Sequence, residues 1–267
     1  MAAENEPPPI ITLTTDFGTG SRYVAAMKGV ILSINPRATI VDISHSVLPQ
    51  NIRAGAIVLA NSAPWFPPNT IHVSVIDPGV GSRRRIVYAR IGSQQFVAPD
   101  NGLLSRLAMM EQPSTIISIE DPRHWLPNVS RTFHGRDIMA PVAARLSLGL
   151  SPDELGPMQD QLVEIPWPEA KQVPNRIEGE VIEVDSFGNL ITNITREMLD
   201  KAARSDSVVI TCDEHETQGI FSTFSEQPPM TFVAHIGSTN HLELAIVNDN
   251  ASAMLGVKVG APVHVAW

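Results

Sequence analysis

Short runs of β-branched residues alternate with stretches of helical spacing through the first 150 residues of the chain. The clearest helical stretch places Val24, Met27 and Ile31 on one face, and Pro36 ends it. The pattern predicts strands at residues 10–15, 39–44, 71–76, 86–91 and 95–98, and helices at 22–34, 52–60, from 103 onward and at 137–148. Alternating strands and helices are typical of a mostly parallel sheet with helices on both faces.

The second half of the chain has a different pattern. Residues 151–175 contain several prolines and no clear period, which is typical of a linker. Short strand-like runs separated by Gly, Asp, Asn and Ser then follow, at residues 179–184, 190–194, 207–211, 231–235, 242–247 and 262–265. We therefore expect an α/β N-terminal domain at 8–165, a linker at 166–176 and a smaller all-β C-terminal domain at 177–267. The strand spacing predicts an antiparallel sandwich or barrel for the latter.

Composition narrows the function classes. The 267 residues carry a formal net charge of −9, which argues against nucleic-acid binding because that needs clustered Lys and Arg. Cys212 is the one cysteine, so neither a disulfide framework nor a cysteine metal site is expected. The chain has no apolar signal region and no uninterrupted apolar run of membrane-spanning length. We therefore expect a cytoplasmic protein that makes no contact with membranes.

Several charged residues that could form a functional site follow the end of the strand at 71–76. Asp77 follows that strand, a turn containing Pro78 and Gly79 comes next, and three arginines occupy positions 83–85. Open α/β sheets present ligand-binding groups at the carboxyl ends of their strands. A site for a charged substrate and a tight turn with solvated arginines both fit this stretch, and the second polar stretch at residues 133–137 favours the site.

Two further carboxylates have both a functional and a structural interpretation. Asp16 ends the first strand before Gly18 and Gly20, where an Asp can hold a ribose diol or simply cap the next helix. These glycines do not form the Gly-x-Gly-x-x-Gly fingerprint of dinucleotide-binding folds. Asp185 begins the turn at residues 185–189, which alone reads as an ordinary turn.

A metal site is the remaining possibility for these polar residues. His72, Asp77, His134 and Asp137 are residue types that commonly bind metals. Their spacing matches no usual ligand pattern, so we expect no metal.

Six motifs, taken together and in order, carry a resemblance that extends over nearly the whole chain. They are Thr15-Asp16-Phe17-Gly18, Lys28-Gly29, Ile-Asp-Pro-Gly-Val-Gly at residues 76–81, Pro-Asp-Asn-Gly at 99–102, Phe-His-Gly-Arg-Asp at 133–137 and Asp-Ser-Phe-Gly-Asn at 185–189. The set resembles the S-adenosyl-L-methionine hydroxide adenosyltransferases, which are adenosine-forming hydrolases related to the fluorinating and chlorinating enzymes. The resemblance implies an α/β domain plus a smaller β domain, and a homotrimer that binds its substrate between subunits.

The resemblance also implies roles for individual residues. The catalytic residues would be Asp77, Arg84 and His134, with Arg83 and Arg85 pointing away. The implied substrate contacts are Asp16 (ribose), Ser21 and Asp185 (methionine amine), Phe187 and Asn189 (adenine), Phe224, Ser238 (carboxylate end), and the backbone at Ile246 and Asn248 (adenine edge). Two positions depart from the family pattern, since Ser21 stands where an Asp is common and Gln50 where an aromatic residue is common.

The implied reaction is hydrolysis of S-adenosyl-L-methionine at C5′ by an activated water, giving adenosine and L-methionine without a cofactor. Water rather than halide should be the nucleophile, because the chain lacks the long insertion of the halogenating relatives. Two alternatives remain open from the sequence. One is a protein that binds S-adenosyl-L-methionine or a nucleoside with little turnover, which the two departures favour. The other is a metal-dependent hydrolase.

Overall fold

The computed structural model describes residues 7–202 and 208–267. The chain divides into two compact units, Met1–Ile165 and Pro166–Trp267. Each unit has its own hydrophobic core, so each is described by itself.

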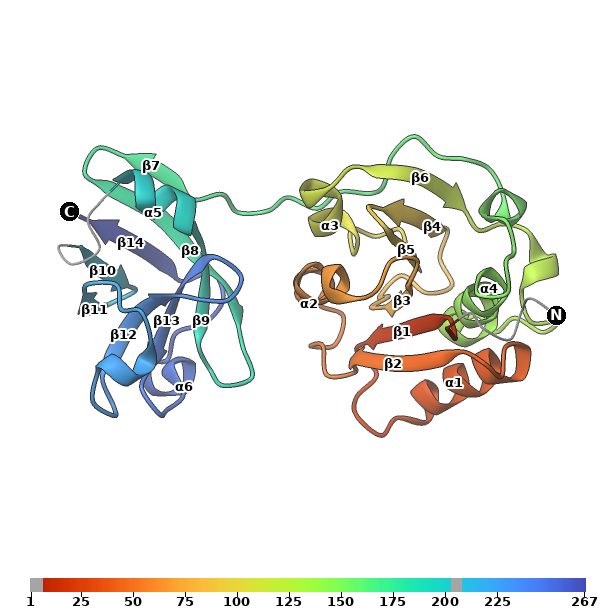
Figure 1. Cartoon of the computed structure of the whole chain (residues 1–267), viewed down its shortest axis with the longest axis horizontal. Helices are drawn as coiled ribbons and strands as arrows, with labels where there is room; N and C mark the ends of the chain where they lie inside the picture. Colours follow the sequence, from red (N-terminus) through yellow and green to blue (C-terminus); the bar gives the residue numbers. More distant parts are fainter. Residues whose placement is uncertain (1–6, 203–207) are drawn as a thin grey trace. The chain divides into compact units, whose positions relative to one another are not determined.

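A six-stranded sheet forms the centre of the N-terminal unit (Figure 1), in the order β2-β1-β3-β5-β4-β6. The strands are β1 (Ile10–Thr15), β2 (Thr39–Ser44), β3 (Ile71–Val75), β4 (Ile86–Ile91), β5 (Gln94–Pro99) and β6 (Pro113–Ser118). The pairs β1–β2, β1–β3 and β3–β5 are parallel, whereas β4 is antiparallel to both β5 and β6. The sheet is therefore mostly parallel, as the sequence predicts.

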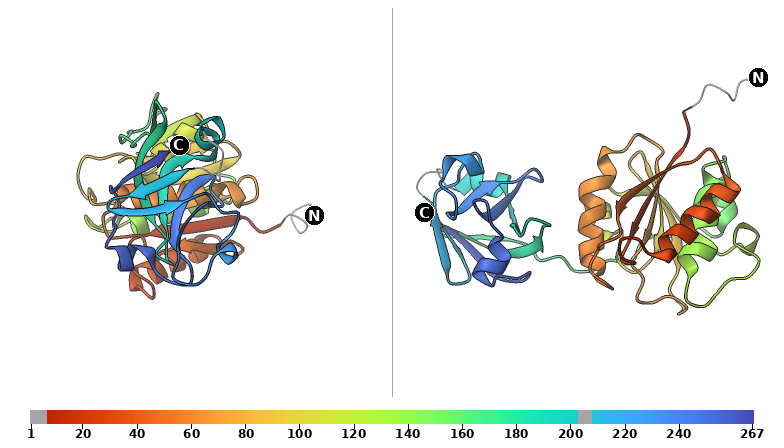
Figure 2. Two further views of the ribbon diagram at one scale, coloured as in Figure 1. Left: turned by 90° about the vertical axis from the view of Figure 1, so that its left-hand side faces the viewer. Right: turned by 90° about the horizontal axis from the view of Figure 1, so that it is seen from below.

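Helices cover both faces of this sheet (Figure 2), which confirms the three-layer prediction. One face carries α1 (Arg22–Ile34) and α4 (Ala140–Leu146), whose apolar side chains form one core cluster with the strands. The other face carries α2 (Ile52–Ser62) and α3 (Ser105–Met110), which pack in a second cluster. Short turns of helix are Ala63–Trp65, Pro122–His124, Gly135–Met139 and Pro152–Leu155.

The C-terminal unit is built from antiparallel strands in the order β11-β10-β14-β8-β9-β13-β12, with β7 added beside β8. These are β7 (Lys171–Val173), β8 (Arg176–Val184), β9 (Leu190–Thr195), β10 (Val209–Cys212), β11 (His215–Gln218), β12 (Phe232–Ile236), β13 (His241–Ile246) and β14 (Pro262–Ala266). The first half of β8 pairs with β14 and its second half with β9, so the sheet bends. Thr217 Oγ1 donates to the carbonyl of Phe232 at 2.8 Å and links the two edge strands. The predicted all-β domain is confirmed as nearly barrel-shaped.

Several elements differ from the sequence prediction. The sequence pattern indicates neither β6 nor β11, and it does not indicate the helices α5 (Arg196–Ala202) and α6 (Ala251–Leu255). Part of the predicted linker pairs with β8 as β7. The predicted strand at 207–211 begins at a residue outside the described ranges. In the described parts of the chain, no helix combines the length and apolar character needed to cross a bilayer.

Candidate active site

The turn after β3 carries the first polar group of the site. Asp77 lies two residues beyond the end of β3, and its side chain is only 4% exposed. Gly81 in the same turn has φ +79°, and a Cβ at this position would collide with the carbonyl oxygen of Arg131. Glycine is therefore required both for the backbone conformation and for close approach of the loop that leads to His134.

Arg84 joins Asp77 to His134. Its Nε donates to both carboxylate oxygens of Asp77 at 2.9 Å, and its Nη2 adds a further ion-pair contact to Oδ2. The same Nη2 lies 3.0 Å from His134 Nδ1. The Arg84 side chain is 10% exposed, so the pair is largely removed from water. The structure thus brings together the three residues that the resemblance names as catalytic.

The neighbouring arginines behave differently. Arg83 is exposed. Arg85 Nε donates to Asp100 Oδ2 at 2.9 Å, and its guanidinium also binds Gln159. Of the three consecutive arginines, Arg84 is therefore the one that meets His134.

Sheet topology explains how His134 reaches Asp77 across more than fifty residues. Because β4 is antiparallel to both β5 and β6, β6 runs in the same direction as β5 and β3. The loop that leaves the carboxyl end of β6 therefore starts at the edge where β3 ends. This loop leads to His134 at the start of the Gly135–Met139 helical turn, and Gly135 packs against Val75 at the end of β3.

The electrostatic surroundings set the state of the His134 ring. Burial and the Arg84 guanidinium lower the pKa of His134 below its usual value, against a smaller opposite effect of Asp77 and Asp137. The ring is therefore neutral near pH 7. A guanidinium can only donate, so His134 Nδ1 accepts from Arg84 and the ring proton is on Nε2.

A cavity of about 250 Å³ opens beside these residues within the N-terminal unit. Its walls come from the ends of β1 and β3, the turn at Gln50 and the loop before α4. They consist of Asp16, Phe17, Gln50, Val75, Asp77, Pro78, Val80, Thr132, Phe133, His134 and Gly135. Asp16 Oδ2 accepts from the backbone N–H of Gln50 at 2.7 Å, and within the described chain Asp16 Oδ1 has no hydrogen-bond partner. One oxygen of this carboxylate is thus available to a ligand.

The four residues considered as a metal site are not gathered in one place. His72 is fully buried in the core, where it stacks on Phe96 with ring centroids 4.9 Å apart. Burial lowers the pKa of His72 to about 4, so this ring is neutral. Asp137 is bound by Arg136 and by the backbone N–H of Ser130. Residues 7–202 and 208–267 contain no group of three or more His, Cys, Asp or Glu arranged to hold a metal ion.

Comparison with known protein families gives a match to both units of the chain. Residues 11–156 match the SAM hydroxide adenosyltransferase N-terminal domain, and residues 179–264 match the C-terminal domain of the same family. The chain belongs to the SAM hydroxide adenosyltransferase family. It is 36% identical over 263 residues to the (R)-S-adenosyl-L-methionine hydrolase of Salinispora tropica, spanning 97% of this chain and 98% of that protein. The corresponding hydrolase of Methanocaldococcus jannaschii is 39% identical over 264 residues, spanning 93% of this chain and 92% of that protein.

A more distant enzyme and a solved structure also match this chain over most of its length. A fluorinase from an Actinoplanes species is 30% identical over 221 residues, spanning 73% of this chain and 74% of that enzyme. An uncharacterized conserved protein from Thermotoga maritima has the same fold, with a TM-score of 0.91 and 35% identity over 96% of this chain and all of that one.

Ser21 is the N-cap residue of α1. Its Oγ accepts from the backbone N–H of Tyr23 at 3.2 Å and thereby caps the amino terminus of α1. Ser21 does not line the cavity described above. Gln50, the other departure from the family pattern, does line it and adopts a left-handed backbone with φ 63°.

The predicted substrate contacts of the C-terminal unit lie on its turns. Asp185 Oδ1 accepts from the backbone N–H groups of Phe187 and Asn189 at 2.8 Å, and the Asn189 amide donates to Asp185 Oδ2 at 3.0 Å. This network holds the turn and leaves Phe187 77% exposed. Phe224 meets the ring of His235 edge-on at 4.3 Å.

The other three predicted contacts of this unit are spread along one hairpin. Ser238 lies in the turn between β12 and β13, Ile246 ends β13, and Asn248 follows with a left-handed backbone.

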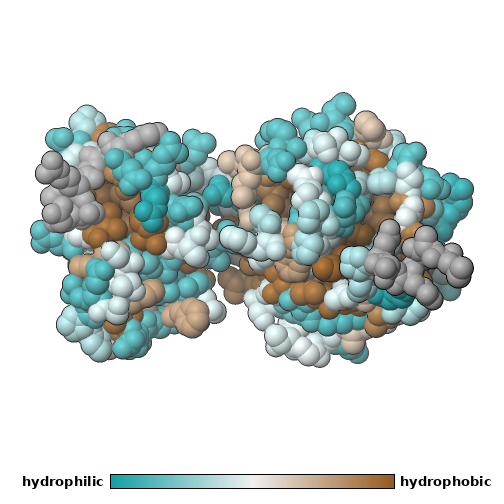
Figure 3. Space-filling model, viewed as in Figure 1, coloured by the Kyte–Doolittle hydropathy of each residue, from teal (hydrophilic) through white to brown (hydrophobic). Residues whose placement is uncertain are grey.

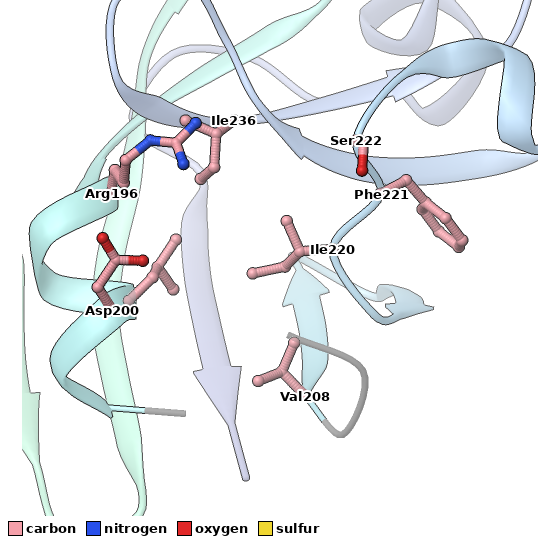
Figure 4. Close-up of a pocket in the computed structure, with 8 residues that line it drawn as sticks. Arg196, Asp200, Val208, Ile220, Phe221, Ser222 and Ile236 are labelled. Carbon is pink, nitrogen blue, oxygen red and sulfur yellow. The ribbon is translucent and has the colours of Figure 1, made fainter. Parts of the chain in front are cut away.

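A larger cavity of about 430 Å³ occurs in the C-terminal unit. Figure 4 shows Arg196 and Asp200 of α5 on one side and Ile220 and Ser222 on the other. Apolar patches interrupt the mainly polar surface of this unit on the face shown in Figure 3. None of the predicted site residues lines this cavity, so we place the candidate active site at the smaller cavity that contains His134.

Proposed function

We propose that this chain hydrolyses S-adenosyl-L-methionine at C5′, giving adenosine and L-methionine. The observation that carries the proposal is the Asp77–Arg84–His134 cluster, which lies at a cavity that Asp16 also lines. The names of the relatives that match nearly the full length of this chain support the same reaction.

The chemistry of the substrate defines what the protein must provide. Its sulfonium sulfur leaves C5′ as a neutral thioether, so the leaving group needs no general acid. What the reaction lacks is a nucleophile, because bulk water has a pKa of about 15.7. Attack of hydroxide on a cation also removes charge, which a pocket poor in water favours.

Each residue of the cluster would have a distinct part. Arg84 Nη1 makes no hydrogen bond within the described chain, so its N–H groups can stabilise the negative charge that develops on the water oxygen. His134 Nε2–H can orient that water as a hydrogen-bond donor. Asp77 Oδ1 accepts one hydrogen bond from Arg84 and retains a lone pair, so it can take the proton.

Atoms, electrons and charge balance in the resulting step. The water oxygen forms a bond to C5′, the C5′–S bond breaks with its electron pair going to sulfur, and one proton of the water passes to Asp77. Deprotonation of Asp77 by solvent restores the starting state.

Substrate recognition would be divided between the two units. Asp16 would hold the ribose diol through its free oxygen, Asp185 the methionine amine, and Phe187 and Asn189 the adenine. Since each unit alone supplies only part of these contacts, we propose a cytoplasmic homotrimer in which sites are completed between subunits. Light scattering should show a trimer, and a stable, fully active monomer would refute this assembly.

Product analysis tests the reaction. The purified protein is incubated with S-adenosyl-L-methionine, and the products are separated by chromatography. We expect adenosine and methionine in equal amounts, formed at the same rate with and without a chelator. Binding without adenosine release would favour a binding protein, and loss of turnover with the chelator would favour a metal-dependent hydrolase.

A further inference from the structure

A chain of polar side chains lies behind Asp16. Lys28 Nζ on α1 donates to Asp42 Oδ2 on β2 at 2.6 Å, and Asp42 Oδ1 lies 3.0 Å from His45 Nε2. His45 Nδ1 lies 2.9 Å from Thr15 Oγ1 at the end of β1, and Thr15 Oγ1 accepts from the backbone N–H of Phe17 at 3.3 Å. These contacts connect three separate segments of the N-terminal unit to the loop that carries Asp16.

The Asp42 carboxylate lies between Lys28 and His45 in this chain. Burial raises the pKa of Asp42, but hydrogen bonds from Lys28 and His45 outweigh it and the net pKa is lowered, so the carboxylate stays ionised. His45 Nε2 lies 3.0 Å from that carboxylate, within ion-pair distance. On the other side of the ring, His45 Nδ1 and Thr15 Oγ1 share a hydrogen bond, and a lone pair of the Thr15 oxygen receives the Phe17 N–H.

The order of carboxylate, imidazole and hydroxyl is the one that activates nucleophiles in many hydrolases. Thr15, however, is fully buried, with 0% of its surface exposed. A hydroxyl in that position cannot touch a substrate, so the chain cannot generate a nucleophile here. Its effect must be on the backbone that it holds.

We propose that the Lys28–Asp42–His45–Thr15 chain is a positioning device that fixes Asp16 for binding a sugar diol. Thr15 and Phe17 are the two neighbours of Asp16, and the chain binds both. The His45 carbonyl also accepts from the N–H of Gly18 at 2.8 Å, where the backbone is left-handed with φ +89°. Asp16 is thereby held on both sides; that its ligand is a nucleoside rests on the proposed function.

The same strand offers a matched control. Thr12 of β1 is also fully buried, and its Oγ1 lies 2.8 Å from Nδ1 of the buried His72. Thr12→Val therefore removes the same kind of hydroxyl–imidazole bond from the same strand, away from Asp16. A general loss of stability should affect both valine variants, whereas a positioning effect should appear only at Thr15.

The first test measures adenosine binding by calorimetry. We expect Thr15→Val to weaken adenosine binding by about 10-fold, the size expected for loss of one buried hydrogen bond. Thr12→Val should change it less than about 2-fold, and Thr15→Ser should restore most of the affinity. Equal losses for the two valine variants would overturn the proposal.

A second ligand shows whether the effect passes through the diol. 2′,3′-Dideoxyadenosine lacks the hydroxyls that Asp16 would hold. The Thr15→Val variant should therefore bind this ligand with the same affinity as the wild type does. An equal loss for adenosine and the dideoxy ligand would contradict the positioning role.

Amide hydrogen exchange tests the network without any ligand. Exchange at Phe17 and Gly18 should accelerate in Thr15→Val and stay unchanged in Thr12→Val; unchanged rates in Thr15→Val would overturn the proposal. If the wild type bound neither nucleoside, the proposed function would fail, and these rates would still decide the positioning role.

Discussion

Replacing Arg84 by methionine tests whether this arginine, and not its neighbours Arg83 and Arg85, is needed for turnover. The change removes the guanidinium from Asp77, whose side chain is 4% exposed, and from His134. Breaking a buried ion pair on one side typically costs about 3–5 kcal/mol of stability. Loss of charge stabilisation at the reacting oxygen should lower kcat by about 10²-fold, which corresponds to about 2.7 kcal/mol in activation free energy.

Arg85→Met supplies the control, because Arg85 also pairs with a buried carboxylate. The Asp100 side chain is 2% exposed, while Arg85 itself is 35% exposed. This variant should therefore lose stability but keep its turnover, and Arg83→Met should change neither. The melting temperature, kcat and KM are measured for all three variants at a temperature where each is folded.

Affinity for S-adenosyl-L-methionine should change little in Arg84→Met, since the guanidinium would contact the water and not the nucleoside. The catalytic role of Arg84 is refuted if Arg83→Met or Arg85→Met loses turnover as severely as Arg84→Met, or if all three remain active.

The charge state of His134, the recognition of the methionine amine and the choice of nucleophile can each be tested. The pKa of His134 is lowered, so its ring is neutral at every pH above about 6.5, the ordinary pKa of a histidine. We therefore expect kcat to be independent of pH in that range and to fall only at lower pH, as the ring gains a proton. A rise in kcat on acidification would contradict this. Asp185→Asn should raise KM far more than Ser21→Ala, because charge-assisted hydrogen bonds are about twice as strong as neutral ones and Ser21 already caps α1; equal shifts in KM would show that the amine is held elsewhere. Chloride or fluoride at high concentration should yield no halogenated nucleoside by mass spectrometry, because the Asp77 carboxylate repels anions at the nucleophile position.

The sequence predicts the N-terminal layers well because each strand and helix there carries its own signal. Val24, Met27 and Ile31 have helical spacing, and all three are buried in α1. The strand β6 was missed because its first residues, Pro113, Ser114 and Thr115, have no apolar alternation, and its pairing with β4 supplies what the local pattern lacks.

Only some residues of the candidate active site can be predicted from local sequence patterns. Asp77 is marked by the strand that ends before it, but nothing local distinguishes Arg84 from its two neighbours. That choice depends on a contact with His134, fifty residues away in the chain. The Thr15–His45 contact likewise arises from the placement of β2 beside β1, where the register shifts between Leu13 and Thr14. Long-range pairings of this kind leave no trace in local periodicity.

We propose that water, activated by the Asp77–Arg84–His134 cluster, attacks C5′ of S-adenosyl-L-methionine. A single turnover experiment in ¹⁸O-enriched water, followed by mass spectrometry of both products, tests it most directly. We expect the heavy isotope in the 5′-hydroxyl of adenosine and unlabelled methionine. Unlabelled adenosine, or a label in methionine, would contradict it.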